Sequence, residues 1–157
     1  MTDRELMTMA IKEAEKGIRS GDGGPFGAVV AFNGKPLAAA HNRVIKNNDP
    51  TQHAEISAIS RASRELKKYD LSGCVIYTTT EPCPMCFSAI HWAKINKIFY
   101  GTSILDVKAL GFNELIISSA EMKAFSGSSI ELYPGCLIEE CRELFETWRS
   151  LPDKQIY

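Results

Sequence analysis

Two short motifs that lie far apart in the chain constrain its fold more than any other feature. The first is His53-Ala54-Glu55, and the second is Cys83-Pro84-Met85-Cys86, which Glu81-Pro82 precedes. An imidazole and two thiols are ligands that zinc prefers, and a carboxylate such as Glu55 transfers protons. The chain must therefore fold so that these two motifs meet.

The second motif predicts the start of a helix. Proline is tolerated in the first helical turn, so Cys83 is expected at the N-cap and Pro84 at the first helical position. Cys83 and Cys86 then face the same side of the helix. Free backbone N–H groups and the positive end of the helix dipole lower a thiol pKa there and favour the thiolate that a metal needs.

His53 is the candidate for the third zinc ligand. Two thiolates and one neutral imidazole leave the fourth tetrahedral position to water, whose pKa falls towards about 7 on coordination. Glu55 is placed to take up the proton of that water and pass it to a leaving group. The alternative is a structural zinc site, but none of the other cysteines and histidines stands at ligand spacing from the motifs. The pattern therefore favours catalysis.

The composition bounds the class of protein. A chain of 157 residues is expected to form one domain, and its formal net charge of -1 provides no overall field that attracts nucleic acid or an acidic membrane. No apolar run approaches the roughly 18 residues of a membrane span. The five cysteines are an odd number, and no secretory leader opens the sequence. We therefore expect a cytoplasmic protein with reduced thiols.

Hydrophobic periodicity and turn residues predict the order of the elements. Helices are expected at 3–20, 51–68, 83–94, 118–125 and 137–151. Strands are expected at 27–32, 35–40, 73–79, 97–101 and 129–133. Asn33-Gly34 is a hairpin signal between the first two strands, and residues 103–117 are expected to be irregular. This order predicts an α/β fold, a three-layer α/β/α sandwich around a mixed five-stranded sheet, with zinc where two helix N-termini meet at the strand ends.

The sequence resembles the cytidine deaminase-like superfamily over nearly its whole length. The resemblance rests on Gly24-Pro25-Phe26-Gly27-Ala28-Val29, on the two zinc motifs, and on the C-terminal helix and tail. Within the superfamily the chain is most similar to bacterial guanine deaminases. The residues that point there are Gly24-Pro25-Phe26-Gly27, Asn42, Asn48-Asp49-Pro50-Thr51, Trp92, Gly111-Phe112 and Tyr157. The resemblance implies a Zn²⁺-dependent hydrolytic deaminase that converts guanine to xanthine and ammonia.

The resemblance also implies a purine pocket. Phe26 and Trp92 would line it, and Asn42 would hold the edge of the base. Glu114 corresponds to a family aspartate that assists proton transfer. Its longer side chain shifts the carboxylate by more than about an ångström, which is a departure from the family pattern. From residue type alone, Asn42 fits a strand-end turn equally well, and Trp92 fits the core equally well.

The C-terminal tail, residues 152–157, is the part of the single domain that the resemblance assigns to an interface. The family forms homodimers in which a swapped tail carries the final tyrosine into the partner's pocket, which would make Tyr157 a substrate-binding residue. The alternative for Tyr157 is a frayed chain end.

Other functions remain open beside guanine deamination. A tRNA adenosine deaminase shares both zinc motifs, but RNA binding requires Lys and Arg beside the pocket, and residues 139–157 contain three basic and five acidic residues. Cytosine, a nucleoside or a triazine are further substrates compatible with the motifs. A non-catalytic zinc scaffold is the hypothesis from another class. We expect a small-molecule purine as substrate, with neither nucleic acid nor membrane as partner.

Overall fold

A mixed sheet forms the middle layer of the protein, whose computed structural model describes every residue from Met1 to Tyr157. Its strands are β1 (Gly27–Phe32), β2 (Lys35–His41), β3 (Cys74–Thr80), β4 (Lys97–Thr102) and β5 (Glu131–Pro134). They lie in the order β2-β1-β3-β4-β5. β1 is antiparallel to both of its neighbours, whereas β3, β4 and β5 run parallel to one another. The mixed five-stranded sheet predicted from the sequence is thus confirmed.

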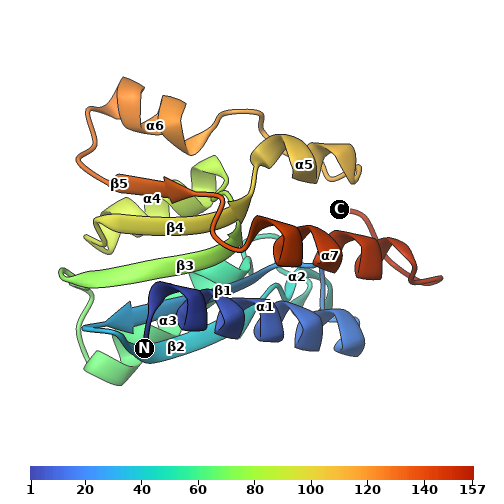
Figure 1. Cartoon of the computed structure of the whole chain (residues 1–157), viewed down its shortest axis with the longest axis horizontal. Coiled ribbons are helices and arrows are strands. Elements are labelled where there is room, and N and C mark those ends of the chain that lie inside the picture. The colour runs from blue at the N-terminus through green and yellow to red at the C-terminus, as the bar shows by residue number, and fades with distance from the viewer.

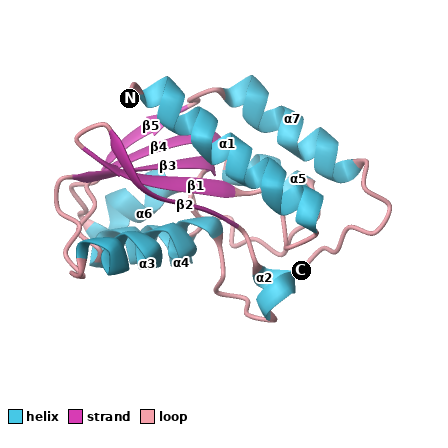
Figure 2. Cartoon of the chain, turned by 90° about the horizontal axis from the view of Figure 1, so that it is seen from below, coloured by secondary structure: helices cyan, strands magenta, loops and turns pink.

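Helices cover both faces of this sheet. They are α1 (Asp3–Ser20), α2 (Val44–Asn47), α3 (Ala54–Leu66), α4 (Pro84–Trp92), α5 (Ile104–Ala109), α6 (Ser119–Ser126) and α7 (Ile138–Arg149). α1 and α7 pack on one face, and α3, α4 and α6 lie on the other (Figures 1 and 2). A separate hydrophobic core fills each interface, as the three-layer sandwich requires. No helix combines the length and hydrophobicity needed to cross a bilayer.

The hairpin that opens the sheet follows directly from its turn residues. Asn33 and Gly34 both have positive φ angles, 49° and 71°, which a two-residue turn of this twist requires. The turn sets β2 beside β1, and His41 at the end of β2 pairs with Gly27 at the start of β1. The segments before β1 and after β2 therefore lie side by side at one end of the sheet.

Three helices differ from the sequence-based prediction. α3 begins at Ala54 rather than at residue 51, because the Asp49 side chain accepts hydrogen bonds from the backbone N–H and the hydroxyl of Thr51, at 2.9 and 2.7 Å. These bonds stabilise a turn in place of a first helical turn. α2 was not predicted, and α5 lies within the stretch predicted to be irregular. The reciprocal hydrogen bonds of Ser103 and Asp106 start α5.

Gly27 allows α1 to pack closely against β1. A Cβ atom at this position would overlap the carbonyl oxygen of Ala10 and would lie 2.7 Å from the backbone nitrogen of Ala14. This packing therefore requires a residue without Cβ at position 27. Since Gly27 directly follows the loop of Gly23 to Phe26, the same packing fixes where that loop lies.

Gly27→Ala should lower the free energy of unfolding by about 3 kcal/mol, because the added methyl group forces the α1 backbone away from the sheet. Urea denaturation measures this change. Gly127→Ala is the control, since its Cβ meets open space and only the positive φ opposes it, at a cost of about 1 kcal/mol. If Gly27→Ala were the milder of the two, close packing would not be the reason for glycine at this position.

Candidate active site

The N-termini of α3 and α4 form the base of the candidate site. His53 is the N-cap of α3, and Cys83 is the N-cap of α4. Neither side chain makes a capping hydrogen bond within its own helix, and Pro84 occupies the start of α4. The predicted helix positions of Cys83, at the N-cap, and of Pro84, at the first helical residue, are confirmed. The prediction for His53 is corrected from the first helical turn to the N-cap, because the Asp49 turn delays the helix.

Three ligand atoms converge between these two helix ends. His53 Nδ1 lies 3.7 Å from Cys83 Sγ and 3.5 Å from Cys86 Sγ. A tetrahedral ion with Zn–S bonds of about 2.3 Å and a Zn–N bond of about 2.0–2.1 Å separates nitrogen from sulfur by about 3.6 Å. The three groups therefore fit zinc. No fourth His, Cys, Asp or Glu joins this cluster.

The two thiols of the cluster have opposite pKa shifts. A hydrogen bond from the Cys86 thiol lowers the pKa of Cys83 to about 4, whereas burial raises the pKa of Cys86 well above its usual range. Burial opposes charge on His53, but its interactions with the Cys83 sulfur and nearby carboxylates outweigh this effect and raise its pKa. Because zinc binds thiolates and neutral imidazole, binding releases the protons that these groups retain.

Glu55 lies in the first turn of α3 beside the cluster but is not part of it. Only 6% of its surface is exposed, and its Oε1 accepts a hydrogen bond from Thr78 Oγ1 at 3.2 Å. Burial raises the pKa of Glu55. A buried carboxylate whose proton is held more tightly than usual is suited to accept and return a proton during a reaction.

A pocket of about 220 Å³ opens above the cluster. His53, Glu55 and Cys83 form its base. Its walls contain four further residues that the resemblance assigned to the substrate: Phe26, Asn42, Glu114 and Tyr157. The structure thus brings together residues from the loop before β1, the end of β2, the segment after α5 and the chain terminus.

Asn42 is fully buried, and only one of its two side-chain polar atoms has hydrogen-bond partners. Its Oδ1 accepts hydrogen bonds from the backbone N–H groups of Gly24 and Val44, at 3.3 and 3.2 Å. Its Nδ2 has no hydrogen-bond partner. A buried amide donor without a partner is costly, so a ligand that accepts from Nδ2 gains affinity.

An aromatic cluster holds the C-terminal tail against the pocket. The Phe112 ring packs edge-to-face on Phe26 and on Tyr157, with centroid distances of 5.3 and 5.1 Å. The Gly24 N–H donates to the Tyr157 hydroxyl at 3.3 Å, and burial raises the pKa of this phenol. Tyr157 is therefore anchored in the pocket of its own chain and is not a frayed end.

Glu114 reaches the pocket from the loop that follows α5. It is half-buried, and burial, followed by the charge of Cys83, raises its pKa to about 7.

Trp92 is the exception among the residues assigned to the pocket, because it is 81% exposed at the far end of α4. Trp92 lies six residues beyond Cys86, which is about 9 Å further along α4, and nine residues beyond Cys83. The assignment of Trp92 to the pocket of its own chain is corrected.

The family is decided by a match to the model of the cytidine and deoxycytidylate deaminase zinc-binding region over residues 1–102, a range that contains both zinc motifs. The chain belongs to this family. The deaminase is 37% identical to the guanine deaminase of Bacillus subtilis, and the alignment covers both chains completely. It is 36% identical to the tRNA-specific adenosine deaminase of the same organism, over 90% of this chain and 85% of that one.

Solved structures agree with the sequence relatives. The guanine deaminase from Nitrosomonas europaea superimposes with a TM-score of 0.86 at 29% identity, covering 96% of the deaminase and 86% of that chain. The similarity to bacterial guanine deaminases and the cytidine deaminase-like fold are therefore confirmed. The protein is a hydrolytic deaminase, and its cofactor is zinc.

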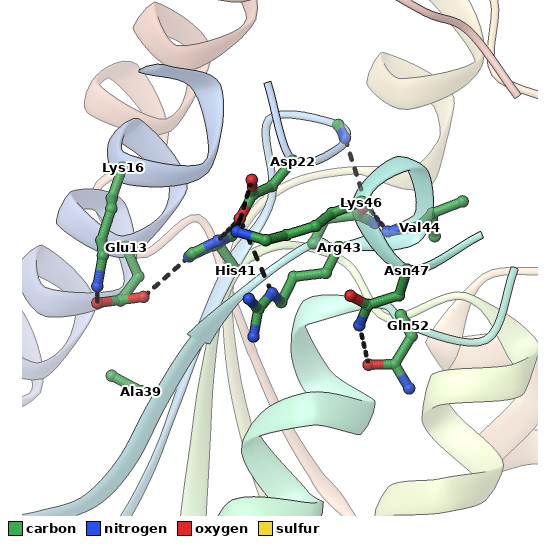
Figure 3. A network of polar contacts seen from close by, with 12 residues as sticks. Glu13, Lys16, Asp22, Ala39, His41, Arg43, Val44, Lys46, Asn47 and Gln52 are labelled. Atoms are coloured by element: carbon green, nitrogen blue, oxygen red, sulfur yellow. Dashed lines mark hydrogen bonds and ion pairs between the residues drawn. The ribbon is translucent and has the colours of Figure 1, made fainter. Parts of the chain in front are cut away.

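Sequence reasoning missed a buried polar network behind the pocket (Figure 3). The two ring nitrogens of His41 contact Glu13 Oε2 at 3.1 Å and Asp22 Oδ2 at 2.9 Å. Lys46 Nζ also donates to Asp22, at 3.1 Å. His41 directly precedes Asn42, so the network fixes the backbone that presents the Asn42 amide. Asp22 lies in a glycine-rich segment that gave no signal of this role.

Cys83→Ala should lower zinc affinity at least about 100-fold, since loss of a ligand exceeds the about 10–100-fold cost of losing a group that orients one. Metal analysis after dialysis against a weak chelator measures the zinc that each protein retains. Cys136→Ser is the control, because Cys136 lies outside the cluster, and it should retain zinc as the unaltered protein does. Equal retention by both variants would contradict the ligand set.

Proposed function

We propose that this deaminase acts on guanine and hydrolyses it to xanthine and ammonia. The observation that carries the proposal is the small pocket that Phe112 and Tyr157 close above His53 and Cys83. Its volume of about 220 Å³ is below the roughly 300–1,000 Å³ of sites for larger ligands, which favours a free base. The end-to-end alignment with the guanine deaminase of Bacillus subtilis also supports this substrate.

The proposed zinc ligands are His53, Cys83 and Cys86. Bound there, zinc supplies Lewis acidity that makes water nucleophilic at neutral pH. Three protein ligands would hold zinc there, the number typical of catalytic sites, whereas structural sites have four. The protein groups around the site then determine which bond is broken.

Glu55 is proposed as the main proton carrier. Its carboxylate takes the proton of the attacking water and delivers it to the ring nitrogen N3 of guanine as the oxygen bonds to C2. It then carries the second water proton to the amino group on C2, which leaves as ammonia when the C2–N bond breaks. Glu114, with a pKa raised to about 7 by burial, is proposed as a second route for the proton to the amine.

Substrate recognition is proposed to rest on Asn42 and Phe26. The free Nδ2 of Asn42 is a donor for the carbonyl oxygen O6 of guanine, and the Phe26 ring forms an apolar wall for the flat base. Tyr157 is proposed to close the pocket over the bound base. Adenine presents an amino group instead of O6, so Asn42 would discriminate against it.

A panel of free bases, nucleosides and a tRNA anticodon stem-loop, assayed for ammonia release, tests the substrate. Guanine should be hydrolysed at least about 100-fold more efficiently than adenine or cytosine, because mismatched groups leave buried donors unpaired. Glu55→Ala is the control for catalysis by this site: it should retain zinc but lose ammonia release. Turnover of cytosine or of adenosine in RNA, with guanine untouched, would refute the proposal.

Asn42→Asp tests the recognition of O6 separately. The aspartate keeps the oxygen that accepts from Gly24 and Val44 but removes the amide donor, so the protein should fold while kcat/KM for guanine falls at least about 100-fold. Steady-state kinetics measures the change. Asn47→Asp is the matched control on the exposed end of α2 and should have no effect. Wild-type kinetics for Asn42→Asp would remove Asn42 from substrate recognition.

A tRNA adenosine deaminase is the second candidate, because relatives of that activity are also 36% identical to this chain. Phosphate contacts would make RNA binding fall steeply with salt. The acidic balance of residues 139–157 argues against such contacts. Salt-dependent binding of the anticodon stem-loop in a gel-shift assay would reverse the order of the two candidates.

We also propose that the deaminase works as a homodimer in the cytoplasm. Large apolar side chains stand exposed on the α4–α6 side, including Trp92 and, at 87% exposure, Phe125, which is typical of a surface that another chain covers. All five cysteines are free, in keeping with a reducing compartment. Residues 152–156 are exposed, so in the proposed dimer the tail is exchanged between two chains, and one Tyr157 makes the contacts with Phe112 and Gly24 in the other's pocket.

A further inference from the structure

Glu81 is a buried carboxylate that the mechanism above does not use. It follows β3 directly, two residues before Cys83, and 6% of its surface is exposed. Its Oε2 accepts a hydrogen bond from the backbone N–H of Ile104 at 2.9 Å, and its Oε1 accepts one from the backbone N–H of Ser119 at 2.7 Å. No lysine, arginine or histidine pairs with it.

The two donors are the first residues of two helices. Ile104 begins α5, and Ser119 begins α6. Backbone N–H groups at a helix start lack partners within the helix, and the helix dipole adds positive charge there, so one carboxylate is stabilised by both ends at once. Glu81 thereby binds the two helices that bracket residues 110–118, the segment that carries Glu114.

The backbone around Glu81 ties this arrangement to the zinc motif. The Glu81 N–H donates to the carbonyl oxygen of Thr102 at 2.8 Å, and the Ser119 hydroxyl donates to the carbonyl oxygen of Pro82 at 3.2 Å. Pro82 is covalently bonded to Cys83. Ser119 directly follows the Glu114 segment and contacts both Glu81 and Pro82. These contacts therefore set the distance between Cys83 and that segment.

We propose that Glu81 is a positioning residue that holds Glu114 at its working distance from the zinc ligands. The inference rests on the proposed role of Glu114 in proton transfer. On its N-terminal side the Glu114 loop is held by the buried Phe112 ring, whereas Leu115 to Ile117 on its C-terminal side are exposed and depend on what fixes the start of α6. Glu81 holds Ser119, directly after this loop, and Ile104, at the start of the helix that leads into it, while the tail contacts the loop at Asn113.

Glu81→Gln is the sharpest change, because it keeps the shape of the side chain and removes one acceptor. The amide NH₂ then faces one of the two backbone N–H donors, and one helix start loses its partner. Displacement of a catalytic group by about 1 Å costs about 100-fold in rate, so kcat should fall about 10–100-fold. Glu81 borders the pocket, but both of its carboxylate oxygens are engaged by Ile104 and Ser119. KM should therefore change less than about threefold, because substrate recognition is proposed to rest on Asn42 and Phe26.

A double-mutant cycle with Glu114→Gln tests whether Glu81 acts through Glu114. Kinetics are measured on whichever base of the panel is hydrolysed fastest, with zinc content determined for each variant. We expect Glu81→Gln to retain zinc and the double variant to be no slower than Glu114→Gln alone, within about twofold. Losses that multiply, or loss of zinc from Glu81→Gln, would overturn the inference. Full activity of Glu114→Gln would instead remove Glu114 from the proposed mechanism, and Glu81 with it.

Two further variants make the test independent of how well Glu81→Gln folds. Ser119→Pro deletes the donor to Oε1 from the other side, together with the hydroxyl that donates to Pro82. Proline suits the first helical position, and Ser118 already has the extended backbone that precedes proline. It should lower kcat as Glu81→Gln does. Glu121→Gln is the matched control, because Glu121 caps the same helix through Ser118 but contacts nothing near Cys83. It should leave kcat unchanged; an equal loss would show general weakening of α6 and refute the inference.

Discussion

The meeting of two helix N-termini is the constraint on which the rest of this structure depends. His53 and Cys83 are N-caps whose side chains leave the backbone uncapped and converge with Cys86 on one point. Each helix start supplies free N–H groups and positive potential, which favours thiolates at the site. The sheet makes the meeting possible, because β1 pairs with β3 and so brings the chain before α3 alongside the chain before α4.

The pocket above this point is assembled from segments that have little to do with zinc. The segments that flank the hairpin of β1 and β2 contribute Phe26 and Asn42, and the chain end contributes Tyr157. Their positions depend on the buried His41 network and on the aromatic packing of Phe112. A common zinc centre with a separately built pocket explains how one family includes enzymes named for guanine and for tRNA adenosine.

Single residues in the sequence correctly predicted the features that depend only on the backbone angles of those residues. Pro84 indicated the start of α4, and Asn33-Gly34 indicated the hairpin, because both act through backbone angles. The start of α3 was predicted three residues early, since the competing hydrogen bonds of the Asp49 side chain are not visible in a hydrophobic pattern. Trp92 was assigned to the pocket by resemblance, yet its exposure is a tertiary property. The partners of Glu81 lie 23 and 38 residues away, so only the fold reveals them.

The coordination of zinc tests the central claim most directly. X-ray absorption spectroscopy of the zinc-loaded protein should give two sulfur neighbours at about 2.3 Å and two nitrogen or oxygen neighbours at about 2.0–2.1 Å, from Cys83, Cys86, His53 and one solvent molecule. A shell of three or four sulfurs would mean that another cysteine closes the site. A shell without sulfur would mean that zinc binds elsewhere, and either result would contradict an open catalytic zinc site between the two helix ends.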